Sequence, residues 1–270
     1  MKARSTRGRA PETTVADAIA AGLAPDGGLY MPEAWPRRAA ADFDGDQALP
    51  AVATRLLTPF FADGPLAAAL PGICADALAI APPLRPFGAA GDHVLELFHG
   101  PTAAFKDYGA AFLAGCLAAL PRGARPLTIV VATSGDTGAA VAAAFHRRPG
   151  VRVAILYPDG RVAPRQAHQL GCFGDNVRAF RVDGSFDDCQ RIAKDLLSDG
   201  DFRAEVPLGS ANSISLGRLL PQAAYYAHAA LAHWRAHGRP LDFVVPTGNL
   251  GNALACLLAR RIGLPIGGIV

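Results

Sequence analysis

From residue 93 onward, short apolar segments alternate with longer segments of helical periodicity, and this alternation limits the possible folds more than any other feature. The strand-like segments are 93–98, 127–132, 151–157, 177–182, 241–246 and the run that begins at Pro265. Helical patterns cover 107–120, 138–147, 163–170, 185–198, 213–236 and 251–261. Strands that alternate with such helices form right-handed βαβ units, so the sequence predicts an α/β fold with a largely parallel sheet.

Residues 1–85 have a different pattern, rich in Ala, Pro and Gly, with short helical segments at 14–22, 50–62 and 65–70. We interpret them as a small N-terminal domain, and we expect residues 86–270 to form a second domain. The chain stops at Val270, inside an apolar run that resembles the start of another strand. The second domain is therefore expected to be truncated at its C-terminal end.

The composition indicates a globular protein and argues against several classes. Hydrophobic residues make up 51% of the chain, and the net charge of +3 is spread without basic runs, which argues against nucleic-acid and membrane partners. The apolar runs are too short or too interrupted for a transmembrane helix. Five dispersed cysteines without a CxxC pair, and histidines without ligand spacing, favour a cytoplasmic protein with no metal site.

Lysine is rare in this chain: 23 of the 26 basic residues are Arg, and only Lys2, Lys106 and Lys194 are Lys. Lys106 lies in the segment HGPTAAFKDYG (99–109), between a predicted strand and a predicted helix. A lysine among apolar residues at a helix start is suited to react through its neutral amine with an aldehyde, which Arg cannot do. An ordinary surface lysine beside Asp107 is the alternative interpretation.

Two further loops follow predicted strands. ATSGDTGAA (132–140) is dense in donors at a helix start and can bind a carboxylate, although helix capping explains it equally well. PTGNLGN (246–252) can bind a phosphate or form a plain tight turn. It is not GxGxxG and no acidic residue follows at the ribose-binding spacing, so a dinucleotide is disfavoured. We expect all three loops at one sheet edge.

Together these loops resemble the threonine synthase family, whose members use pyridoxal 5'-phosphate and share the fold of the tryptophan synthase β chain. The resemblance runs from Ser5 to Val270 and rests on STRG (5–8), GLAPDGGLYMP (22–32), the three loops and NSISLGRLLPQAAYY (212–226). It implies PLP fold type II, a three-layer α/β/α arrangement with a largely parallel sheet and a small N-terminal domain. Ser215, Leu216 and Leu250 depart from residues common in the family.

The resemblance also implies roles for individual residues. Lys106 would be the catalytic residue, attached to pyridoxal phosphate as a Schiff base. The cofactor would also contact Asp136, Gly248, Asn249, Leu250, Gly251 and Asn252. The substrate would contact Thr133, Ser134, Gly135, Thr137, Asn212, Ser213 and Arg218. A buried structural role for Arg218 is equally compatible with the sequence.

The implied reaction is a β,γ-replacement that converts O-phosphohomoserine and water to L-threonine and phosphate. A related phospho-lyase that releases a keto acid, and a non-catalytic fragment, are the alternatives. The family residue that meets the pyridine nitrogen lies beyond position 270, so residues 1–270 alone are expected to be inactive. The resemblance leaves a monomer or a homodimer open.

Overall fold

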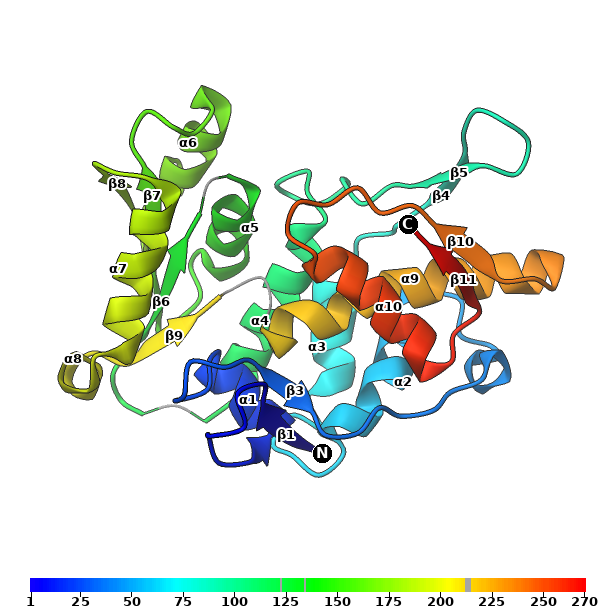
Figure 1. The fold of residues 1–270 in the computed structure, drawn as a ribbon, viewed down its shortest axis with the longest axis horizontal. Coiled ribbons are helices and arrows are strands. Elements are labelled where there is room, and N and C mark those ends of the chain that lie inside the picture. Colours follow the sequence, from blue (N-terminus) through cyan, green and yellow to red (C-terminus); the bar gives the residue numbers. More distant parts are fainter. Residues whose placement is uncertain (122, 134, 212–214) are drawn as a thin grey trace.

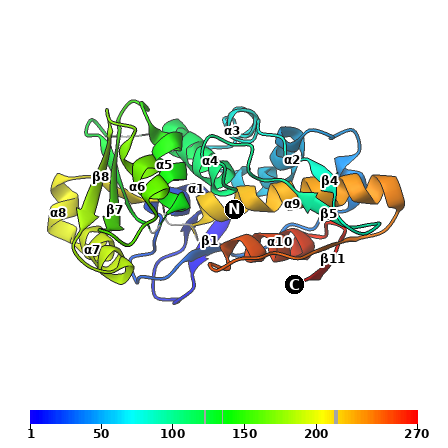
Figure 2. The same cartoon turned by 90° about the horizontal axis from the view of Figure 1, so that it is seen from above.

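The computed structural model describes residues 1–121, 123–133, 135–211 and 215–270 (Figure 1). A four-stranded sheet with its helices occupies one end of the molecule. The long helix α9 (Leu216–His237) extends from that region toward the opposite end (Figure 2). Helix α4 (Lys106–Ala119) runs through the middle of the molecule.

The four-stranded sheet is parallel throughout and has the strand order β8-β7-β6-β9. Its strands are β6 (Leu127–Ala132), β7 (Val151–Pro158), β8 (Val177–Val182) and β9 (Leu208–Ser210). Its helices are α5 (Asp136–Phe145), α6 (Pro164–Gly171), α7 (Phe186–Ser198) and α8 (Gly200–Glu205). Helices α5 and α7 lie on opposite faces, which gives the expected three layers (Figure 1). The largely parallel sheet is confirmed.

The strand order reverses beside β6, because β7 pairs with one of its edges and β9 with the other. In open α/β sheets, ligands bind outside the carboxyl ends of the strands at such a reversal. The loop that follows β6 and begins α5 lies at this point. The topology therefore places Thr133, Gly135 and Asp136 at the expected ligand crevice.

Two small sheets lie outside the main one. Strands β4 (Leu84–Pro86) and β5 (His93–Leu95) form an antiparallel pair, and β10 (Leu241–Phe243) pairs in parallel with β11 (Ile266–Ile269). Both β5 and β10 are shorter than the predicted strands. The expectation of three loops at one sheet edge is wrong, because the strands before them belong to three different sheets.

Close helix packing keeps α4 and α9 together. A Cβ atom on Gly109 of α4 would lie 2.8 Å from the backbone oxygen of Arg218, and one on Gly217 of α9 would lie 2.8 Å from Leu113. The absence of side chains at these two glycines therefore lets the backbones approach. Phe112 and Tyr225 are fully buried in the resulting core.

The N-terminal part joins the same hydrophobic core. It contains β1 (Lys2–Ser5), β2 (Thr13–Thr14), α1 (Val15–Ala21), β3 (Tyr30–Pro32), η1 (Ala40–Phe43), α2 (Leu49–Phe61) and α3 (Leu70–Ala77). The helix expected over 65–70 is wrong: this segment forms turns and α3 begins at Leu70. Pro71 explains the position, because a proline fits the first turn of a helix but not its interior.

The first two sequence motifs meet at Asp26. Its carboxylate accepts hydrogen bonds from the Ser5 hydroxyl at 2.7 Å and from the backbone N–H groups of Arg9 and Ala10, each at 3.0 Å. The N–H of Gly28 also donates to it. These bonds lower the pKa of Asp26 to about 2, with Ser5 as the largest cause. The motifs thus tie the N-terminal strand to the loop before β3.

Candidate active site around Lys106

Lys106 is the first residue of α4, and its amine faces the start of α5. Its Nζ lies 3.3 Å from Oδ2 of Asp136 and 4.5 Å above the ring of Phe105. The Lys106 side chain is 22% exposed and that of Asp136 is 45% exposed. The amine is therefore shielded on one side and still reachable from solvent.

Asp107 holds the loop that presents Lys106. Asp107 is 3% exposed, and its carboxylate accepts hydrogen bonds from the backbone N–H of Thr102 at 3.0 Å and from the Thr102 hydroxyl at 2.5 Å. Between them, Ala103 adopts a left-handed φ of 54°, a conformation that costs a residue with a Cβ about 1–2 kcal/mol. The two bonds from Thr102 stabilise this turn. Sequence reasoning treated Asp107 only as a neighbour of Lys106, because a single Thr and Asp five residues apart form no recognised pattern.

The loop after β6 is organised by the buried side chain of Thr133. The Thr133 hydroxyl donates to the backbone oxygen of Gly135 and accepts from the N–H groups of Gly135 at 3.1 Å and Gly138 at 3.0 Å. Thr133 is 2% exposed, so its hydroxyl serves the turn. Thr137 is only partly buried and lies in the first turn of α5 beside Asp136.

Gln166 of α6 also contacts Asp136. Its Nε2 donates to Oδ1 of Asp136 at 2.9 Å, while Lys106 contacts the other carboxylate oxygen. Sequence reasoning missed Gln166, because a glutamine on an amphipathic helix resembles any solvent-facing polar residue. Asp136 therefore connects α4, α5 and α6.

The segment before α10 (Gly251–Ile262) forms an open loop. The Thr247 hydroxyl donates to the backbone oxygen of Asn249 at 2.6 Å, and residues 248–250 are exposed. A Cβ on Gly248 would meet no atom within 4 Å. The first turn of a twelve-residue helix carries free backbone N–H groups, so an anion can approach here.

Asn252 connects this loop to the centre of the molecule. Its side-chain oxygen accepts hydrogen bonds from the hydroxyls of Tyr225 and Tyr226, both on α9. The ring of Tyr225 also packs against that of Tyr108 in the first turn of α4, with centroids 5.4 Å apart. The starts of α4 and α10 are thus joined through one buried tyrosine, although they follow strands of different sheets.

Arg218 is fully buried in α9. Its Nη1 donates to the backbone oxygen of Ala211 at 2.9 Å, whereas Nε and Nη2 have no hydrogen-bond partner in the part of the chain that the structure describes. Burial lowers the pKa of Arg218 to about 10, and the Asp107 carboxylate opposes this shift. Three other predicted site residues, Ser134, Asn212 and Ser213, lie outside the described residues.

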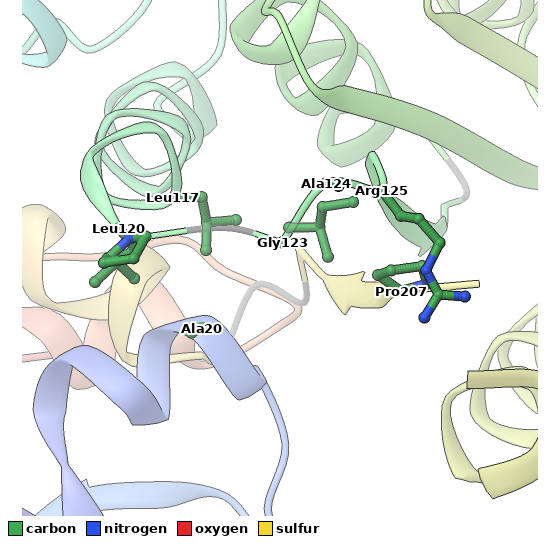
Figure 3. A pocket seen from close by; sticks show the side chains of 9 residues that line it. Ala20, Leu117, Leu120, Gly123, Ala124, Arg125 and Pro207 are labelled. Atoms are coloured by element: carbon green, nitrogen blue, oxygen red, sulfur yellow. The ribbon is translucent and has the colours of Figure 1, made fainter. Parts of the chain in front are cut away.

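A separate pocket of about 440 Å³ lies at the other end of α4. Its walls include Leu117, Leu120, Arg125 and Pro207 (Figure 3). Leu117 is eleven residues after Lys106, or roughly 16 Å along the helix axis. This pocket is therefore distinct from the site around Lys106.

Over residues 1–121, 123–133, 135–211 and 215–270, no three His, Cys, Asp or Glu side chains are grouped so that they could hold a metal ion. No helix within these ranges is long and apolar enough to cross a membrane.

Known protein families match two segments of this chain. A family model described as pyridoxal-phosphate dependent enzyme matches residues 94–266, and one described as threonine synthase N terminus matches residues 2–78. The curated threonine synthase of Escherichia coli is 37% identical over 98% of this chain and 62% of its own length. That of Pseudomonas aeruginosa is 39% identical over 100% of this chain and 59% of its own length.

Solved structures give the same result. The chain has a TM-score of 0.88 with PLP-bound threonine synthase from Brucella melitensis, at 41% identity over 100% of this chain and 60% of that one. Threonine synthase from E. coli also gives 0.88, at 37% identity over 100% of this chain and 63% of that one. The chain thus spans less than two thirds of the length of these relatives.

Pyridoxal phosphate needs an amine for its aldehyde and backbone N–H groups for its phosphate. The partly shielded amine of Lys106 and the open loop at Gly248 fit these two needs, and Tyr225 connects the helices that carry them. Family match, fold and local geometry therefore agree on the cofactor. The chain belongs to the pyridoxal-phosphate-dependent enzyme family, within which it matches the N-terminal part of the threonine synthases.

Proposed function

We propose that the protein is a threonine synthase that converts O-phosphohomoserine and water to L-threonine and phosphate. The match of residues 2–78 to the threonine synthase N terminus supports this branch of the family. The observation that carries the proposal is the Lys106 amine, held at the strand-order reversal 3.3 Å from Asp136. An amine in this position can react with an aldehyde and can also exchange a proton with a carboxylate.

Lys106 has two tasks in this proposal. Its Nζ attaches the cofactor, and it then takes and returns protons at Cα and Cβ of the substrate. Pyridoxal phosphate, when bound, supplies the electron sink for the loss of these protons. Asp136 lies within reach of Nζ and can pair with it between transfers.

The start of α5 is the proposed site for the substrate carboxylate. Backbone N–H groups in the first turn of a helix attract an anion, and Gly135 and Thr137 lie at this turn. The Thr133 hydroxyl shapes the same turn. Ser134 is assigned to this site from the sequence motif alone.

Arg218 remains the proposed contact of the substrate phosphate. Its two nitrogens without described partners support this role, because a buried guanidinium gains much from a further acceptor. Asn212 and Ser213 keep their predicted roles at the substrate on the motif alone. The competing interpretation is that Arg218 has a structural role and only donates a hydrogen bond to the backbone oxygen of Ala211.

The loop at residues 248–252 is the proposed phosphate site of the cofactor. Gly248 leaves room for phosphate oxygens, and the first turn of α10 offers N–H donors. The side chain of Asn252 can contribute only through its amide nitrogen, since its oxygen accepts from two tyrosines. Asn249, Leu250 and Gly251 contribute their backbone.

We further propose a cytoplasmic enzyme that acts on a small molecule, as a monomer or homodimer. The cysteines support this location: Cys74, Cys116, Cys172, Cys189 and Cys256 are all free. We also propose a division into residues 1–85 and 86–270. The separate matches of residues 2–78 and 94–266 are compatible with that division.

The test is an assay of the protein that contains residues 1–270, saturated with pyridoxal phosphate and supplied with O-phosphohomoserine. Release of phosphate together with equimolar L-threonine supports the proposal. Phosphate release with a keto acid would instead identify a phospho-lyase, and no release in a protein that binds the cofactor would identify a non-catalytic binder.

A further inference from the structure

Asp136 is held from two directions by residues of two other helices. Oδ2 faces Nζ of Lys106 at 3.3 Å, and Oδ1 accepts a hydrogen bond from Nε2 of Gln166 at 2.9 Å. The two contacts use different oxygens of one carboxylate. Its plane is therefore set by Gln166 on one side and by Lys106 on the other.

The second contact matters because the first one is weak by itself. The Asp136 side chain is 45% exposed, and a partly exposed ion pair gains little after solvent screening and loss of side-chain freedom. Without another anchor, the carboxylate can rotate toward water. The neutral Gln166 amide donates to the oxygen that Lys106 does not contact. It can therefore fix the orientation of the carboxylate without displacing Lys106.

Gln166 is itself held in place by the packing of α6 on α5. A Cβ on Gly135 would lie 2.6 Å from Nε2 of Gln166, so the amide rests directly against the backbone of that glycine. Three residues after Gly135, Gly138 of α5 provides the space that Leu170 of α6 fills, and Leu170 is 1% exposed. These two contacts fix α6 relative to the start of α5, and with it the direction of the Gln166 side chain.

We infer that Gln166 is a positioning residue: it holds the Asp136 carboxylate in the orientation that pairs with the Lys106 amine. It thereby keeps the Lys106 amine in this ion pair until the amine reacts. The inference rests on the proposed role of Lys106 as the reacting amine.

Competitive acylation of the full chain without cofactor tests this inference. Limiting acetic anhydride, at one mildly alkaline pH, labels only neutral amines, and peptide mass spectrometry measures the labelling of each lysine. The chain has three lysines, and the exposed Lys194 serves as the internal reference. Gln166→Met removes the donor and keeps a side chain of similar size. We expect it to raise Lys106 labelling relative to Lys194 by about two- to fivefold, the range of a lost, partly exposed ion pair.

A double-mutant cycle separates positioning from simple shielding. Asp136→Asn is expected to raise Lys106 labelling at least as much as Gln166→Met does, and Gln166→Met should add nothing in that background. Gln169→Met is the matched control on the same helix and should leave the ratio unchanged. Equal thermal midpoints of all variants exclude unfolding as the cause.

Two results would overturn the inference. One is an unchanged ratio in Gln166→Met, and the other is the same increase in the Asp136→Asn background, which would mean that Gln166 only covers the amine. Neither outcome depends on cofactor binding. The absorbance of added pyridoxal phosphate in the unsubstituted protein reports separately whether Lys106 is the reacting amine.

Discussion

The hydroxyl of Tyr226 lies 3.0 Å from the side-chain oxygen of Asn252, which couples the middle of α9 to the first turn of α10. Tyr225 donates to the same oxygen, so both acceptor positions of the amide are used. Burial raises the pKa of the Tyr226 phenol, which keeps it a donor near neutral pH. The Asn252 amide is thereby oriented by its oxygen, and no described residue accepts a hydrogen bond from its nitrogen, which leaves that nitrogen available to an anion.

Tyr226→Phe should therefore weaken cofactor binding more than it changes the fold. Loss of one hydrogen bond, worth roughly 0.5–1.5 kcal/mol, lets the amide reorient and should raise the Kd for pyridoxal phosphate by about two- to tenfold. Fluorescence titration measures the Kd. Tyr30→Phe, on strand β3, is the control, and an equal loss of affinity in both variants would contradict the coupling.

Thr102→Val should destabilise the protein through Asp107. The substitution keeps the backbone N–H but removes the hydroxyl that donates to the carboxylate of Asp107, a residue that is 3% exposed. Hydrogen bonds to buried charged groups contribute about 1.5–3 kcal/mol, so the free energy of unfolding should fall by that amount in urea denaturation. Thr58→Val is the matched control, because its hydroxyl donates to a backbone oxygen on the exposed side of α2. A loss no greater than that of the control would show that the Thr102 hydroxyl does not hold the loop.

Asp26→Asn should reduce stability in a pH-dependent way. The pKa of Asp26 falls from 3.8 to about 2 in the folded protein, because Ser5 and backbone N–H groups stabilise the charged form. Its stabilising contribution is therefore complete above pH 3.8 and is lost as the pH falls through about 2. The difference in free energy of unfolding between the unsubstituted protein and the variant should be constant near neutral pH. It should shrink toward zero as the pH falls through this acidic range. A difference that persists at pH 2 would contradict the role of the ionised carboxylate.

The sequence predicted the elements with strong periodicity and missed those that depend on packing. The strand expected at 127–132 and the helix expected at 107–120 agree closely with β6 and α4, because long apolar patterns have one stable local solution. Strand β9 has three residues with a glycine in its centre, which gives no periodic signal. No sequence pattern indicates that β10 lies outside the main sheet.

In the candidate site, too, some residues could be recognised from the sequence and others only from the structure. Lys106 and the glycine-rich loops are recognisable because their chemistry requires particular residue types at particular places. Gln166, Asp107 and Tyr226 contribute through contacts with residues distant in the sequence or through a buried turn. Their importance follows only from the packing of α4, α5, α6 and α9.

Gly248→Ala should affect cofactor binding without affecting the stability of the fold. A Cβ at this position meets nothing within 4 Å, and its backbone is not left-handed, so the free energy of unfolding should change by no more than about 1 kcal/mol. The added methyl group would occupy space proposed for phosphate oxygens and should weaken pyridoxal phosphate binding at least tenfold. Gly72→Ala, which also meets nothing within 4 Å, is the control. Unchanged affinity in Gly248→Ala would place the phosphate elsewhere.

The central claim is that Lys106 is the residue to which pyridoxal phosphate becomes attached. Borohydride reduction of the protein with its cofactor, followed by peptide mass spectrometry, measures this directly, because the alternatives are only Lys2, Lys194 and the N-terminal amine. We expect the reduced adduct on the peptide that contains Lys106, and no comparable adduct in Lys106→Arg, since a guanidinium stays protonated. An adduct on another amine in the unsubstituted protein, or the same cofactor absorbance in Lys106→Arg, would contradict the assignment.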